Sequence, residues 1–176
     1  MKSIMETSLK RIVHLLLLAA LSILTVNAKV ISYPAPKGET LSSDYMVEVD
    51  GVSVPVYMAK TQHHDKKYSI AYFDFSGTVT VKIKSKLSLG HLNILPDKYA
   101  IHSSVNKDIA TFHLNEPCDI SFEPDGCNSP LILFCNELET DIPSKNDPNV
   151  IYFGPGEHNP ENGLIRLGSN QTLYLA

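Results

Sequence analysis

Hydrophobic and polar residues alternate with a period of two along much of the chain between residues 45 and 135. The alternating segments are residues 45–49, 52–56, 68–75, 78–85, 109–114, 118–122 and 131–135. Turn-forming residues separate these segments, and Asp50-Gly51 in particular favours a β-hairpin. Beyond residue 28, no window keeps apolar residues three to four positions apart for more than one or two turns. The pattern therefore predicts an all-β protein whose main part is an antiparallel β-sandwich of about eight short strands.

The last part of the chain has a different pattern. Apolar runs at residues 150–153 and 164–167 each end at a glycine, and a third run follows at residues 172–175. Short strands with tight turns at this spacing predict the first coil of a β-helix, and such coils bury their apolar face only by stacking. The predicted division is a signal peptide (1–28), an extended and mobile leader (29–43), the β-sandwich (44–143), a polar linker with proline (144–149) and the start of a truncated β-helix (150–176).

The N-terminus has the features of a secretory signal peptide. Lys2, Lys10 and Arg11 open it, an apolar run covers residues 12–26, and Ala28 is a small residue at a suitable cleavage position. The apolar run is about 15 residues, shorter than the roughly 20 that span a bilayer, so we expect no stable membrane anchor. We expect cleavage after Ala28 and a secreted or periplasmic protein.

The expected mature chain is acidic. The whole chain has 15 basic and 19 acidic residues, of which the signal peptide holds three and one. The remaining 12 basic and 18 acidic residues give a net charge near −6. A nucleic-acid-binding protein would show a basic face, so this composition argues against that class. An acidic surface also gives no help in binding a polyanion such as pectate.

The chain has three cysteines, an odd number, so at least one thiol is unpaired. Cys118 and Cys135 alternate with apolar residues, and we expect both to behave as small buried hydrophobic residues. Cys127 follows a predicted turn at residues 124–126 and could pair with either of them, so the disulfide connectivity stays open. The spacing of cysteine and histidine does not match a zinc site.

No segment carries a recognisable catalytic set. Gly154-Pro155-Gly156 lacks the lysine or helix start of a phosphate-binding loop, and no serine lies in a nucleophile elbow. The carboxylates considered, all interpreted as solvated, are Asp74, Asp108, Glu116, Asp119, Glu123 and Asp125. The same interpretation applies to His63, His64 and Asp65 in the polar loop at residues 61–67, because adjacent loop residues rarely converge on one ion. We therefore predict no catalytic residue, no cofactor and no metal site.

Three tyrosines are candidate carbohydrate contacts, because aromatic rings on a sandwich face can stack on sugar rings. They are Tyr57, Tyr72 and Tyr152. The alternative is that each ring simply fills a half-buried strand face. Asn170-Gln171-Thr172 is an N-glycosylation sequon, which has meaning in a eukaryotic source.

Several segments together resemble a known family. They are residues 44–51, 72–81, 116–122, 130–134, 147–156 and 169–176, and the segment from Asp147 is the most specific. Over about residues 40–176 the chain resembles the N-terminal part of pectin-lyase-like glycoside hydrolases. These include polygalacturonase-like proteins and the dextranase and isopullulanase group, glycoside hydrolase family 49.

The resemblance implies a β-sandwich that leads into a right-handed parallel β-helix, whose later coils carry the aspartates that act as general acid and base. No position among the 176 residues matches those aspartates. We therefore expect the N-terminal segment of a secreted polysaccharide-degrading hydrolase, inactive by itself, with a polysaccharide or the missing C-terminal β-helix as its partner. The alternative is a stand-alone carbohydrate-binding or docking β-sandwich.

Overall fold

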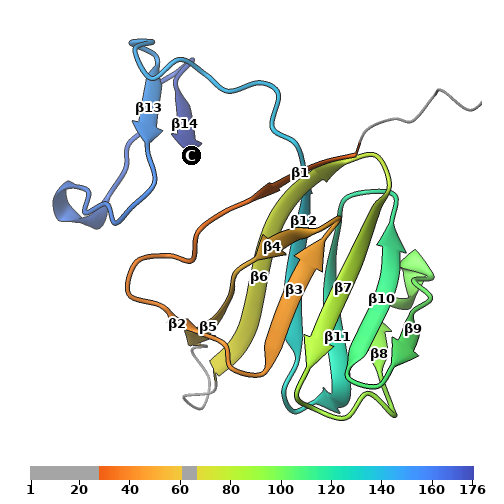
Figure 1. Ribbon diagram of the computed structural model, residues 1–176. Helices are drawn as coiled ribbons and strands as arrows, with labels where there is room; N and C mark the ends of the chain where they lie inside the picture. The colour runs from red at the N-terminus through yellow and green to blue at the C-terminus, as the bar shows by residue number, and fades with distance from the viewer. Residues whose placement is uncertain (1–27, 61–66) are drawn as a thin grey trace, which may run out of the picture.

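The computed structural model describes residues 28–60 and 67–176. Two β-sheets stack face to face as a sandwich, and a two-stranded coil stands beside them at the C-terminal end (Figure 1). The helical segments in these ranges are two short 3₁₀ turns, η1 (Asp97–Tyr99) and η2 (Glu161–Gly163). Within the same ranges, no helix is long and apolar enough to cross a membrane. The fold is all-β, as predicted.

The larger sheet has seven strands. Its order is β2 (Thr40–Leu41), β5 (Val56–Lys60), β6 (Lys67–Ser76), β12 (Leu131–Glu137), β11 (Cys118–Cys127) and β8 (Asn93–Leu95). Strand β1 (Lys29–Ser32) pairs with the second half of β6. Neighbouring strands are antiparallel except β6 and β12, which run parallel. One edge of β6 therefore faces β12, and the other faces β5 and then β1.

The smaller sheet has five antiparallel strands. Its order is β4 (Val52–Val54), β3 (Tyr45–Val49), β7 (Val79–Ser85), β10 (Ile109–Leu114) and β9 (Ser104–Asn106). The predicted hairpin joins β3 to β4, with positive φ at Asp50 (47°) and Gly51 (83°), as a type I′ turn requires. The Thr80 amide donates a 2.8 Å hydrogen bond to Asp50 Oδ1, which ties this turn to β7.

The core lies between the two sheets, where the period-two alternation directs the apolar side chains. Phe73 and Phe75 of β6 and Phe112 of β10 are almost completely buried. Tyr45 of β3 meets Phe122 of β11 edge to face across the two sheets, with ring centroids 6.0 Å apart. Each such aromatic side chain contributes roughly 1.5–3 kcal/mol of burial free energy. The alternation predicted these inward positions.

The segment predicted to be a mobile leader is extended, but it belongs to the larger sheet. Residues 29–32 form β1 and residues 40–41 form β2. Val30 lies opposite Phe75 in the β1–β6 register and packs against the core. The leader lacks an alternating pattern because its order comes from pairing with the edge of β6, which local sequence does not reveal.

The turn predicted at residues 124–126 is wrong, because β11 continues to Cys127. Gly126 adopts a positive φ of 56° within this strand, which bends the strand locally. Pro124 is fully buried. The chain reverses between the end of β11 and the start of β12 at Leu131 instead. Proline and glycine within a strand can mark a bend rather than the end of the strand.

The C-terminal coil consists of β13 (Val150–Phe153) and β14 (Thr172–Leu175), which pair in parallel. Their register aligns Tyr152 with Tyr174, which gives the in-line ladder that successive coils of a β-helix present. The strand expected at residues 164–167 is not formed in the described chain. Leu164 is extended, but Leu164 and Leu167 are 53% and 51% exposed, because no neighbouring strand pairs with them there.

Two predictions concern residues outside the described ranges. They are the signal peptide up to Asn27 and the polar loop with His63, His64 and Asp65.

Candidate functional site

Four tyrosines and two carboxylates gather where the sandwich meets the coil. The members, which we call the tyrosine–carboxylate cluster, are Tyr33, Tyr72, Asp74, Glu139, Tyr152 and Tyr174. Two come from β6, one follows β1, one lies in the linker after β12, and two belong to the coil. The cluster therefore joins segments from both ends of the described chain.

Tyr33 and Tyr72 form an aromatic pair on the outer face of the larger sheet. The alternation in β6 directs Phe73 into the core and Tyr72 away from it, and β1 then carries Tyr33 over Tyr72. Their ring centroids are 5.1 Å apart, with the planes tilted by 47°. The two side chains are 37% and 38% exposed, so part of each ring is open to solvent.

Asp74 lies beneath this pair and is only 4% exposed. The Tyr33 hydroxyl donates a 2.5 Å hydrogen bond to Asp74 Oδ2, while Oδ1 has no hydrogen-bond partner among the described residues. Burial first, and then the hydrogen bond and charge of Asp74, raise the pKa of Tyr33 above its ordinary value. Tyr33 therefore acts as a neutral donor that satisfies one oxygen of a buried carboxyl group.

The coil contributes a second aromatic pair. Tyr152 and Tyr174 are aligned in the β13–β14 register, and their ring centroids are 5.0 Å apart. The Tyr174 hydroxyl donates a 2.6 Å hydrogen bond to Glu139 Oε2. This bond is the main cause that raises the pKa of Tyr174 to about 12. The hydrogen bond to Glu139 therefore connects the coil to the segment that follows β12.

Glu139 also connects the two aromatic pairs electrostatically. Burial is the largest cause of the raised pKa of Tyr33 and of Tyr72, and the Glu139 charge adds a smaller contribution to both. The same carboxylate binds Tyr174 directly. The same carboxylate thus interacts with members of both aromatic pairs. Exposed rings beside carboxylate acceptors suit a ligand with apolar ring faces and hydroxyl groups.

The three predicted tyrosines separate in the structure. Tyr72 and Tyr152 belong to the cluster, whereas Tyr57 lies on β5, where burial and then the Glu39 charge raise its pKa. Asp74, interpreted from the sequence as solvated, is instead buried, because β1 flanks it at the edge of β6, with Ile31 directly opposite, and Tyr33 hydrogen-bonds to it. The sequence reasoning also missed Tyr33, Glu139 and Tyr174. The position of Tyr174 in a third apolar run, parallel to the run of Tyr152, was the signal available.

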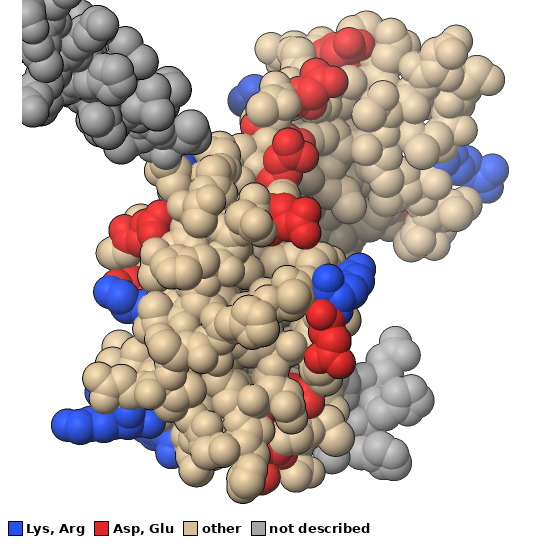
Figure 2. All heavy atoms as spheres, turned by 90° about the vertical axis from the view of Figure 1, so that its right-hand side faces the viewer, with Lys and Arg blue, Asp and Glu red and all other residues tan. Residues whose placement is uncertain are grey.

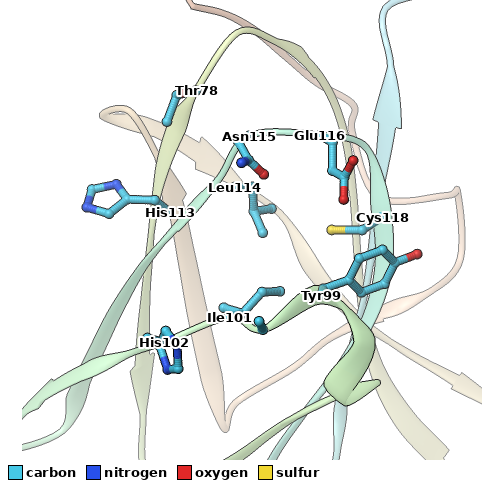
Figure 3. A pocket seen from close by; sticks show the side chains of 10 residues that line it. Thr78, Tyr99, Ile101, His102, His113, Leu114, Asn115, Glu116 and Cys118 are labelled. Carbon is cyan, nitrogen blue, oxygen red and sulfur yellow. The ribbon is translucent and has the colours of Figure 1, made fainter.

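A separate pocket of about 430 Å³ lies between η1 and the turn from β10 to β11 (Figure 3). Tyr99, His102, His113, Asn115, Glu116 and Cys118 are among its lining residues. Figure 3 shows His113 and His102 on one side and Glu116 and Cys118 on the other. In residues 28–60 and 67–176, no three histidine, cysteine or acidic side chains are grouped to hold a metal ion. The described residues that line the pocket therefore form no such metal-binding group.

The surface charge agrees with the acidic composition. Figure 2 shows a band of Asp and Glu side chains running from the lower to the upper part of one face, with Lys and Arg side chains toward its edges. Two exposed ion pairs on the smaller sheet, Lys82–Glu48 at 3.2 Å and Lys84–Asp108 at 3.4 Å, use two of the lysines. The acidic side chains along this band would repel a polyanion.

Comparison with known proteins gives a likeness in fold. No protein-family model matches the chain, and no curated protein matches it. Among solved structures, the chain is similar to Dex49A from Penicillium minioluteum, with a TM-score of 0.54 and 15% sequence identity. The likeness covers 82% of this chain and 43% of Dex49A, so the chain spans less than half the length of that protein. At this identity the likeness shows the all-β fold, shared with a glycoside hydrolase family 49 dextranase.

Proposed function

We propose that these 176 residues are the N-terminal β-sandwich segment of a polysaccharide-degrading glycoside hydrolase. The observation that carries the proposal is the order of the fold, a two-sheet sandwich followed at once by a parallel coil. The likeness to Dex49A, a glycoside hydrolase, supports it. No position among the 176 residues matches the acid and base aspartates that the resemblance implies, so hydrolysis would depend on residues of further coils.

A hydrolysis assay tests this proposal. The purified chain is incubated with dextran, pullulan, polygalacturonan and a mixed plant glycan, and released reducing ends are measured. We expect no release above the buffer control, with the related full-length hydrolases as positive controls. Reducing ends produced by the 176-residue chain, and lost when it is heat-unfolded, would reject the proposal.

The same proposal includes export. The basic opening, apolar run and Ala28 support a signal peptide that is removed in a secreted or periplasmic protein. N-terminal sequencing of the protein recovered from the medium or periplasm is expected to begin at Lys29. A cytoplasmic protein that retains Met1 would contradict this part.

A second candidate function is carbohydrate binding by the sandwich and coil themselves. The exposed Tyr33–Tyr72 pair beside Glu139 favours it, because an aromatic face and a carboxylate acceptor together match the apolar and hydroxyl faces of a sugar. The acidic surface favours a neutral glycan over a polyuronide. In this case the partner would be the polysaccharide itself.

Affinity electrophoresis separates the two candidates. The chain is run in gels with and without dextran, soluble starch or polygalacturonate, alongside Tyr72→Ala and Tyr57→Ala. Binding at the cluster predicts that a neutral glucan retards the wild type and Tyr57→Ala but not Tyr72→Ala, because Tyr57 lies outside the cluster. Equal mobility of all proteins in every gel would remove the carbohydrate-binding candidate and leave the hydrolase-segment proposal standing.

A further inference from the structure

Cys118 and Cys135 lie directly opposite each other on neighbouring strands. They are register partners in the antiparallel pair β11–β12, and both side chains point into the core, 6% and 1% exposed. Directly opposed residues in an antiparallel pair have Cα atoms about 4.5–5.5 Å apart. A disulfide bond needs roughly 4.4–6.8 Å, so the backbone already has the spacing of a disulfide.

We propose that Cys118 and Cys135 are an oxidisable pair that forms a cross-strand disulfide joining β11 to β12 when the protein meets an oxidising thiol–disulfide environment. Both residues are reduced thiols in the structure. The inference rests on the strand register and does not depend on the proposed function.

The third cysteine is excluded as a partner by distance. Cys127 is exposed and lies at the far end of the ten-residue strand β11 from Cys118. A strand of that length spans roughly 30 Å. Because Cys135 is opposite Cys118, it lies at the same end of the strand pair and is similarly far from Cys127. The distances therefore exclude both pairings of Cys127 that the sequence left open, and Cys118–Cys135 is the pairing that the strand register brings together.

The two thiols also differ in their access from the pocket, and this difference decides which of them reacts first. The interaction with Cys135 lowers the pKa of Cys118, whereas the interaction with Cys118, followed by burial, raises the pKa of Cys135. Cys118 lines the pocket beside η1, where Figure 3 shows its sulfur directed into the space next to Tyr99. Cys118 lines the pocket and Cys135 does not, so Cys118 is the thiol that a reagent in the pocket approaches.

The oxidant we name is a small or protein disulfide, of the class that includes oxidised glutathione. Cys118 loses its proton, and its thiolate attacks one sulfur of that disulfide, which forms a mixed disulfide and releases one thiolate. Cys135 then loses its proton and attacks Cys118 Sγ, which forms the Cys118–Cys135 bond and releases the second thiolate. The two released thiolates take up the two protons, and the oxidant gains the two electrons that the cysteine pair loses.

The test uses oxidised glutathione as the probe on the folded, reduced 176-residue protein. After quenching in acid and denaturation, the remaining thiols are alkylated and the protein is digested and analysed by mass spectrometry. We expect two of the three cysteines to resist alkylation, and a linked peptide pair containing Cys118 and Cys135. The disulfide would close a loop of roughly 15–20 residues, so the unfolding constant should fall on the order of a hundredfold relative to reduced protein.

Two variants keep the result interpretable. Cys127→Ser should give the same linked peptides, because its thiol takes no part. Cys135→Ala should leave Cys118 alkylatable or carrying glutathione, with no stabilisation on oxidation. If Cys135→Ala does not fold, the wild-type and Cys127→Ser peptide maps decide alone. Linkage of Cys127 to either other cysteine, or retention of free Cys118 and Cys135 while Cys127 becomes glutathionylated, would overturn the proposal.

Discussion

At the scale of single residues, the burial of side chains on β6 depends both on local alternation and on pairing with a distant segment. Phe73 and Phe75 lie on one face of the alternating segment 68–75, and both are buried. Asp74 was expected on the surface because it alternates with them. It points to the outer face, but β1 flanks it at the sheet edge and Tyr33 binds it, and no local pattern near Asp74 reveals this contact from some forty positions away.

The hydrogen bond from Tyr33 to Asp74 should stabilise the fold, although the Tyr33 side chain is partly exposed. Removing the hydroxyl in Tyr33→Phe leaves Asp74 Oδ2, like Oδ1, without a hydrogen-bond partner among the described residues. A buried polar group left unpaired costs roughly 1–3 kcal/mol, so we expect a loss of that order in urea unfolding. Tyr99→Phe is the control, because its hydroxyl has no hydrogen bond to a described residue. Equal stability of the two variants would contradict the role given to this bond.

Tyr45 should make the protein sensitive to alkaline pH. Burial first, and then Asp44, raise the pKa of Tyr45, and its hydroxyl donates to the Ser129 carbonyl. Above about pH 10 the unfolded chain loses the proton that folded Tyr45 keeps, so unfolding releases protons and stability falls as pH rises. Below that pH the contribution is complete. Tyr45→Phe should therefore lose less stability than the wild type between pH 9 and 11 in urea titrations, and parallel losses would contradict this assignment.

At the scale of elements, turn residues predicted a turn correctly where the turn requires a particular backbone conformation. Asp50-Gly51 predicted a hairpin, and both residues adopt the positive φ of a type I′ turn. Pro124 and Gly126 did not predict the structure correctly, because the same residue types fit either a turn or a bend inside a strand. The parallel pairing of β6 with β12 was outside the reach of local patterns, since their partners lie far apart in the sequence.

Gly51→Ala tests the hairpin turn. No atom lies within 4 Å of the position a Cβ would take, so the cost comes from the left-handed backbone alone. We expect a destabilisation of about 1 kcal/mol. Gly90→Ala is the matched control, because its added Cβ would make an ordinary 3.6 Å contact with Ser88 Oγ and its φ is not positive. Its effect should stay within about 0.5 kcal/mol, and a larger cost there than at Gly51 would contradict the explanation.

The coil should open independently of the sandwich. Its side chains are at most partly buried, whereas the central strands of the sandwich alternate with fully buried residues. Amide hydrogen exchange should therefore be faster in β13 and β14 than in β6 and β7. Tyr174→Phe, which removes the bond to Glu139, should speed exchange in the coil without changing the sandwich. Uniform protection across coil and sandwich would show that the coil does not open separately.

At the scale of the whole molecule, the pattern of short strands predicted the fold class, and the closing apolar runs predicted the parallel coil. The tyrosine–carboxylate cluster was only half predicted. Tyr72 and Tyr152 were named from their strand positions, but Glu139, which interacts with both pairs, lies between β12 and β13 in a segment with no strand pattern. A site assembled from an edge strand, a linker and a coil depends on long-range packing that single-segment patterns do not contain.

The most direct test of the central claim is the sequence of the transcript on the 3′ side of codon 176. A hydrolase whose N-terminal segment is this sandwich and first coil requires further coils, so we predict short apolar runs separated by glycine-bearing turns, with aspartates on the later coils. That pattern should be present in the frame that continues past this codon. A transcript with no coil-like sequence in that frame, or one that continues into amphipathic helices, would contradict the claim.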